Sequence, residues 1–175
     1  GDLLAVATEN HHLAIVDTTA STVWRVRHDR KISGPVRNNT THSVRSIAWG
    51  RDYIAIGGTG NAVSLLSTVA PYGVLHRITG TGFVGSLQWR NDNSILAIAT
   101  RLGKALLYRI STEASERENK VINSEIVHTI SSDNWMNVVA FSADGDFLAT
   151  GDAGGNLSVH SVTVDVIGVH EVEFV

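Results

Sequence analysis

The chain has 175 residues, of which 43% are hydrophobic, and a net charge of −3. It can therefore bury a core, but it provides no positive field that would favour nucleic acid or an anionic membrane. The absence of cysteine excludes disulfides, thiolate metal sites and cysteine nucleophiles, and it fits the reducing compartment of a cytoplasmic or nuclear protein, which we expect.

One strand–turn–strand unit is predicted four times along the chain. Each copy opens with an aliphatic and a small residue, has Gly or Asn in its turn, and carries another aliphatic residue eleven positions after the first. A hairpin that recurs at roughly 40 to 50 residues is typical of a propeller blade, which must stack on copies of itself to bury both faces. The four copies are Leu4–Val16, Ile54–Leu66, Leu96–Tyr108 and Leu148–His160.

Two further strands per copy are predicted, one before the hairpin and one after it. The leading strands alternate in side-chain character and end in a large aromatic residue. The first copy lacks a leading strand, so we expect three strands there and four in each other copy. The leading strands are Val44–Trp49, Val84–Trp89 and Met136–Phe141, and the closing strands are Thr22–Val26, Val74–Ile78, Ile126–Ile130 and Val169–Val175.

Two longer connections interrupt this pattern. The segment from Arg27 to Thr41 contains Gly34-Pro35 and an excess of basic side chains, and the segment from Ser111 to Asn123 is rich in charge. Neither has helical spacing, so both are predicted to be loops. The basic loop is either a solvated surface connection or a docking patch for an acidic partner, where its charge would raise the association rate more than the affinity.

The fourth copy resembles a WD-repeat blade of the β-propeller class. The match is strongest in Val139-Ala-Phe-Ser-Ala-Asp-Gly145 and Leu148-Ala-Thr-Gly-Asp152, and copies two and three share it through Ile47-Ala-Trp49 and Leu87-Gln-Trp89. The resemblance covers about residues 3 to 175. It implies an all-β fold in which residues 1–175 form part of a propeller. About three and three-quarter blades would be present, each blade being a four-stranded antiparallel sheet. The implied blades span about residues 1–30, 42–79, 82–131 and 135–175.

The chain departs from the family pattern at its signature positions. Ser131-Ser132 replaces the family's Gly-His pair in the fourth copy, and of the Trp-Asp pairs only Asp17 keeps one member. We therefore expect the family's hydrogen-bond network of His, Ser or Thr, Asp and Trp to be absent. The blades should then be held mainly by apolar packing of sheet on sheet.

Closure of the propeller leaves three alternatives. Propellers have about four to eight blades, and an open set of blades would expose wide apolar sheet faces. The chain is accordingly a fragment of a longer protein, a half-propeller completed by a partner or by a second copy in a homodimer, or a small four-bladed ring.

Constellations that carry chemistry are scarce. His11-His12 lies in a turn with Glu9 nearby, but adjacent strand residues point to opposite faces, so we expect no metal site there. The Gly-rich turns Gly57–Gly60 and Gly151–Gly155 join two strands and lack the helix N-terminus that a phosphate loop uses. We therefore expect no enzyme activity, no cofactor and no catalytic residue.

The resemblance to WD-repeat blades implies that the loops that enter each blade, and those between its second and third strands, share one face. Aromatic and Arg residues there are the usual anchors of interfaces. Trp135 either anchors a partner or caps its own blade. For Phe83, burial in the core is a better explanation than partner binding. Arg101 and Lys104 are either solvated turn residues or, together, a site that would suit an acidic peptide. The partner-binding candidates are His11, His42, Arg45, Phe83, Arg101, Lys104, Trp135, Asn137 and Asp152.

These observations favour a non-catalytic scaffold that binds other proteins, as a subunit of a complex. The alternative is part of an enzymatic or ligand-binding propeller with its site at the central channel. A nucleic-acid role for the basic loop would require steep salt dependence of binding, and the near-neutral charge argues against it.

Overall fold

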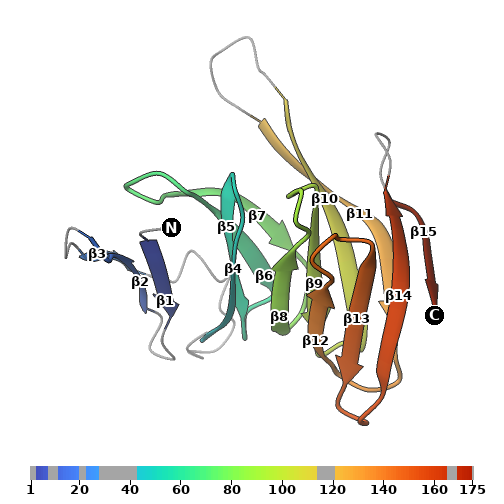
Figure 1. Cartoon of the computed structure of the whole chain (residues 1–175). Coiled ribbons are helices and arrows are strands. Elements are labelled where there is room, and N and C mark those ends of the chain that lie inside the picture. Colours follow the sequence, from blue (N-terminus) through green and yellow to red (C-terminus); the bar gives the residue numbers. More distant parts are fainter. Residues whose placement is uncertain are drawn as a thin grey trace. The chain divides into compact units, whose positions relative to one another are not determined.

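The computed structural model describes residues 3–7, 12–19, 23–27, 43–113, 121–164 and 169–174. Within these ranges every regular element is a strand, and the strands pair in antiparallel sheets (Figure 1). The described residues accordingly contain no candidate for a membrane-spanning helix. The all-β prediction is confirmed.

Each sheet contains strands that follow one another in the chain. The first sheet comprises β1 (Leu3–Ala7), β2 (His12–Asp17) and β3 (Val23–Arg27). The second comprises β4 (Val44–Trp49), β5 (Tyr53–Gly58), β6 (Ala62–Ser67) and β7 (Val74–Thr79). The third comprises β8 (Val84–Trp89), β9 (Ile95–Thr100), β10 (Lys104–Glu113) and β11 (Val121–Ser131), and the fourth comprises β12 (Met136–Phe141), β13 (Phe147–Asp152), β14 (Leu157–Val164) and β15 (Val169–Phe174).

The four predicted hairpins share one register. In every copy the first residue of the predicted unit lies opposite its last residue, so the turn holds the same number of residues each time. Because side chains alternate between faces along a strand, this shared register puts equivalent positions on equivalent faces. Each predicted unit therefore forms an antiparallel hairpin. The opposed pairs are Leu4 with Val16, Ile54 with Leu66, Leu96 with Tyr108, and Leu148 with His160.

Both predicted loops need correction where the structure describes them. Ser111 pairs with Asn123 and Glu113 with Val121, so β10 and β11 continue through the ends of the predicted charged loop. These side chains are mostly exposed, and backbone hydrogen bonds hold an exposed hairpin whatever its charge. Arg27 belongs to β3 rather than to the basic loop. Residues 28–42 and 114–120, which carry most of both loop predictions, lie outside the described residues.

The chain divides into two compact units, Gly1–Val84 and Gly85–Val175. In the first unit, Leu13 and Ile15 of β2 pack in one cluster with Ile54, Ile56 and Leu66 of the second sheet. All five side chains are buried, and each such burial contributes about 1.5–3 kcal/mol.

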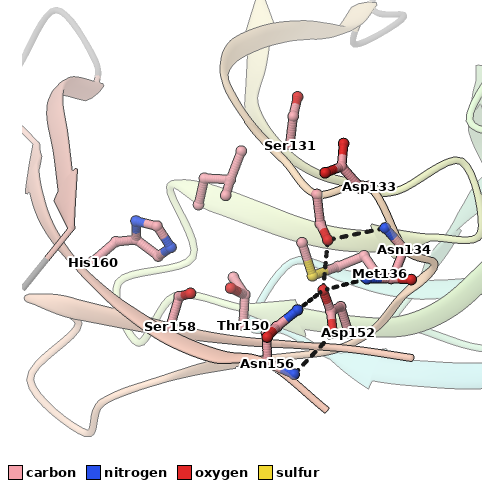
Figure 2. A pocket seen from close by; sticks show the side chains of 11 residues that line it. Ser131, Asp133, Asn134, Met136, Thr150, Asp152, Asn156, Ser158 and His160 are labelled. Carbon is pink, nitrogen blue, oxygen red and sulfur yellow. Dashed lines mark hydrogen bonds between the residues drawn. The ribbon is translucent and has the colours of Figure 1, made fainter. Parts of the chain in front are cut away.

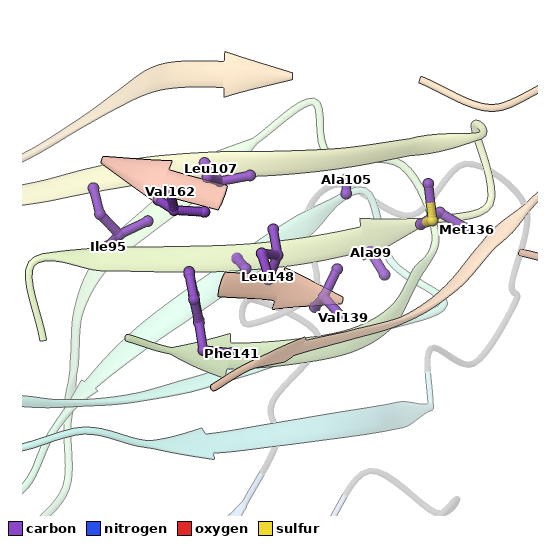
Figure 3. Packing of buried hydrophobic residues seen from close by; sticks show 10 residues of the cluster. Ile95, Ala99, Ala105, Leu107, Met136, Val139, Phe141, Leu148 and Val162 are labelled. Atoms are coloured by element: carbon purple, nitrogen blue, oxygen red, sulfur yellow. The ribbon is translucent and has the colours of Figure 1, made fainter. Parts of the chain in front are cut away.

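The core of the second unit lies between the third and fourth sheets (Figure 3). Leu107 of β10 and Leu148 of β13 are fully buried in it. The small side chains of Ala97, Ala99 and Ala105 belong to the same cluster, and small residues let two sheets approach closely. Apolar packing of sheet on sheet, as predicted, holds this unit.

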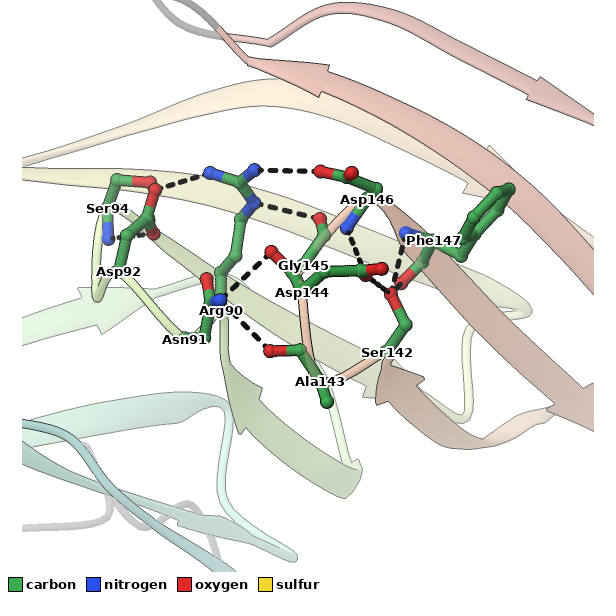
Figure 4. A network of polar contacts seen from close by, with 10 residues as sticks. All are labelled: Arg90, Asn91, Asp92, Ser94, Ser142, Ala143, Asp144, Gly145, Asp146 and Phe147. Atoms are coloured by element: carbon green, nitrogen blue, oxygen red, sulfur yellow. Dashed lines mark hydrogen bonds and ion pairs between the residues drawn. The ribbon is translucent and has the colours of Figure 1, made fainter.

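Polar contacts join the same two sheets at their turns (Figure 4). Arg90 Nε donates to the carbonyl of Gly145 over 2.9 Å, and Asn91 Nδ2 donates to the carbonyls of Ala143 and Asp144. Gln88 Oε1 accepts the backbone N–H of Phe141 over 2.7 Å. The interface is therefore part apolar and part polar, which the sequence did not predict.

Candidate functional site

Three connections of the second unit lie together and form the loop cluster. They are the β9–β10 turn (101–103), the β11–β12 connection (132–135) and the β13–β14 turn with the strand residue on either side of it (152–157). The backbone N–H of Ser132 donates to the carbonyl of Gly103 over 2.7 Å, and that of Ala153 donates to the carbonyl of Trp135 over 2.8 Å. Backbone hydrogen bonds thus fix the central connection to both turns.

An exposed aromatic side chain projects from the loop cluster. Trp135 is 53% exposed, and the guanidinium carbon of Arg101 lies 4.8 Å from the centre of its ring. Stacking of this kind contributes about 0.5–1 kcal/mol at an exposed site. Leu102 in the first turn and Leu157, the first residue of β14, are also exposed, so the loop cluster presents apolar area together with a cation.

Gly103 allows the close approach of the first two connections. Its φ is +72°, and a Cβ atom built there would lie 2.3 Å from the carbonyl oxygen of Ser132. Only glycine occupies this position without strain and without displacing its neighbour. The spacing between the Arg101 turn and the Trp135 connection therefore depends on one residue.

Asp152 is the polar centre of the loop cluster (Figure 2). Its carboxylate accepts from the hydroxyl of Ser132 at 2.6 Å, from Asn156 Nδ2 at 2.9 Å, and from the backbone N–H groups of Gly154 and Asn156, each at 2.9 Å. The hydrogen bond from Ser132, followed by those from Asn156, holds the pKa of Asp152 well below its usual range. A polar network of different composition occupies this sheet: Ser132 and the two Asn side chains, Asn134 and Asn156, supply donors to Asp152, and neither His nor Trp takes part in these hydrogen bonds.

A pocket of about 500 Å³ opens beside Asp152. Its wall includes Asp133 and Met136 from the β11–β12 segment, Thr150 of β13, and Ser158 and His160 of β14 (Figure 2). Thr150 is 3% exposed and His160 is 8% exposed. Burial, with a smaller contribution from His128, lowers the pKa of His160 from its usual value of 6.5, so its imidazole is neutral at pH 7.

The structure brings together some of the predicted partner-binding residues. Arg101, Trp135 and Asp152 belong to the loop cluster, and exposed Lys104 follows its first turn and lies opposite Ser131. Asn137 is exposed at a register shift near the start of β12.

Other predicted positions belong to the first unit or lie outside the described residues. Arg45 is exposed at the equivalent register shift of β4, in the first unit. Phe83 is half-buried and also belongs to that unit. His11 and His42 lie outside the described residues.

Sequence reasoning missed Ser132, Asn134 and Asn156. A usable signal was present, because Asp152 and Asn156 flank two glycines, and Asx residues in turns often bond neighbouring backbone groups. Ser132 gave no such signal, since it lies twenty positions from Asp152.

The part of the chain that the structure describes holds no group of three or more His, Asp or Glu side chains placed to bind a metal ion. Comparison with models of known protein families and with curated proteins found no match to this chain.

Proposed function

We propose that this protein is a non-catalytic interaction module that binds another protein at the loop cluster. The observation that carries the proposal is the exposed Trp135 ring with Arg101 stacked on it. Trp and Arg are the residue types most enriched among binding hot spots. Backbone hydrogen bonds from Ser132 and Ala153 hold the surrounding loops, so little ordering entropy would be lost on binding.

Two substitutions test the partner-binding surface. Trp135→Ala and Arg101→Ala should each reduce partner capture, with about a thirtyfold loss of affinity for a hot-spot residue. Phe147→Ala is the matched control, because Phe147 is another exposed aromatic of the same sheet but lies outside the loop cluster. The measurement is cross-linked capture from extracts of cells that express the protein, quantified by mass spectrometry, followed by calorimetry with the captured partner.

The melting temperature provides the second readout of that experiment. Trp135 is mostly solvated, so its replacement should leave the melting temperature close to that of the wild type. Equal capture by Trp135→Ala, Phe147→Ala and wild type would remove the loop cluster from the proposal.

The finer architecture is part of the same proposal: the four sheets are blades of a WD-repeat-like propeller. The shared register of the four hairpins and the packing of the third sheet on the fourth support it. Blades that lack neighbours would expose sheet faces, so we expect a second copy or a partner protein to cover them. Light scattering tests this: a dimer mass supports completion by a second copy, and a stable monomer with no partner argues for a closed four-bladed ring.

A further inference from the structure

We propose that the pocket beside Asp152 receives a basic side chain, Arg or Lys, from the protein partner. This inference rests on the proposed function for the source of the ligand. It adds the chemical class that the partner must present next to the Trp135 surface.

The charge of the pocket wall has one sign. Asp133 and Asp152 line it, and neither Lys nor Arg is among its lining residues. The donors of Ser132 and Asn156 keep Asp152 ionised, so its negative charge persists although its oxygens are already bonded. Exposed Asp133 supplies the carboxylate that an incoming cation would contact.

Hydroxyl groups complete the set of acceptors. Thr150 is 3% exposed and lines the pocket, and none of the hydrogen bonds among the described residues uses its hydroxyl (Figure 2). Ser131 and Ser158 line the same space. The Thr150 oxygen is not among the fully buried atoms that lack a partner, so it is open to the pocket and free to accept from a bound donor. Ammonium and guanidinium groups are donors only.

The two other titratable or flexible groups in the wall are compatible with a cation. His160 is neutral at pH 7 because burial lowers its pKa, so it adds no repelling charge. Met136 is buried in the wall, and its thioether can pack on the methylene groups of an Arg or Lys stem.

Size and position connect the pocket to the loop cluster. A volume of about 500 Å³ lies within the usual range of ligand pockets and has room for a side chain with its adjoining backbone. Asn134, Asp152 and Asn156 belong both to the loop cluster and to the pocket wall. A partner seated on Trp135 would therefore be within reach of the pocket.

The test uses two small probes of nearly equal shape and different charge. Uniformly ¹⁵N-labelled protein is titrated with N-acetyl-arginine amide and, separately, with the neutral isostere N-acetyl-citrulline amide, and amide shifts are followed by NMR. We expect saturable shifts at Asp133, Thr150 and Ser158 with the arginine probe and at least threefold weaker binding of the citrulline probe, as loss of one charge-assisted contact implies.

Variants separate a specific contact from general charge. Asp133→Asn should weaken binding of the arginine probe about threefold to tenfold. Thr150→Val should weaken it about twofold to fivefold without loss of stability, because it removes a hydroxyl that none of the hydrogen bonds among the described residues uses. The matched control is Asp52→Asn, which changes the net charge equally at an exposed turn of the first unit and should leave binding unchanged.

Three results would overturn the inference: equal binding of the two probes, shifts that avoid the pocket wall, or equal losses in Asp133→Asn and Asp52→Asn. If the arginine probe does not bind while Trp135→Ala still reduces partner capture, the cation-binding role of the pocket is rejected and the proposed function stands. If the arginine probe binds but Asp133→Asn captures the partner as well as the wild type does, the cation does not come from the partner, and the inference is wrong on that point.

Discussion

The hydroxyl of Ser132 donates a 2.6 Å hydrogen bond to the carboxylate of Asp152, which ties the entry of the fourth sheet to the turn between its second and third strands. The same carboxylate organises its own turn through the N–H groups of Gly154 and Asn156. One charged group thus holds two connections of the loop cluster, and Trp135 lies in one of them.

Asp152→Asn should therefore lower the melting temperature and loosen the loop cluster. Asparagine retains one acceptor oxygen but loses the charge that strengthens these hydrogen bonds. Circular dichroism would follow the melting temperature, and amide hydrogen exchange at residues 153–156 would follow the turn. Asp52→Asn is the control for the change in net charge. Unaltered exchange in Asp152→Asn would mean that the turn does not depend on the carboxylate.

Gly103→Ala tests whether the approach of the first two connections depends on glycine. The added Cβ would meet the carbonyl of Ser132, and the φ of +72° disfavours any L side chain. Strain of this kind costs about 1–3 kcal/mol, to be measured by urea unfolding.

Two glycines provide matched controls for that substitution. Gly155 has a positive φ of +85°, but a Cβ atom added there would meet open space. A Cβ atom added at Gly73 would also meet open space. We expect the order of destabilisation to be Gly103, then Gly155, then Gly73, where alanine is near neutral or slightly stabilising. An equal effect of Gly103→Ala and Gly155→Ala would show that the close contact contributes nothing beyond the φ strain.

The hairpins were predictable because two signals coincide in them. Runs of apolar and small residues indicate strands that are buried on both faces, and turn residues set the register, so Ile54 opposite Leu66 follows from the pattern. The register shifts near Arg45 and Asn137 carried no comparable signal. They occupy equivalent places in two copies, yet no residue type is shared between them, since a bulge is a backbone feature that many side chains tolerate.

The sequence could indicate individual residues of the site but not how they contact one another. Trp135, Arg101 and Asp152 stood out as large or charged residues in turns, but their stacking and bonding depend on which turns meet in space. The continuation of β10 past Ser111 was missed for a related reason, because charged exposed positions of a hairpin look like a loop in sequence.

Gln88→Met should destabilise the second unit by about 1–3 kcal/mol, because the backbone N–H of Phe141 loses its acceptor while side-chain volume is nearly retained. Gln88→Glu is the control, since its carboxylate still accepts from that N–H. Urea unfolding of both variants would measure the difference. Equal stability of Gln88→Met and Gln88→Glu would indicate that water replaces the missing acceptor.

The pH dependence of stability should contain a contribution from His160. Its pKa in the folded chain lies below the usual 6.5, mainly because of burial, so the unfolded chain binds the proton first as pH falls. Above pH 6.5 both states are neutral and the contribution is fully present; it is lost as pH falls from 6.5 through the folded pKa, with a slope of at most about 1.4 kcal/mol per pH unit.

His160→Gln should remove that part of the slope when unfolding free energies are measured by urea between pH 5 and 8. His76 in the first unit, whose pKa burial also lowers, should keep its own contribution. Comparison of His160→Gln with His76→Gln and with the double variant therefore assigns the slope to each unit, because the two side chains belong to separate units and their effects should add. Identical pH profiles of wild type and His160→Gln would show that the imidazole is protonated as readily in the folded chain as in the unfolded one.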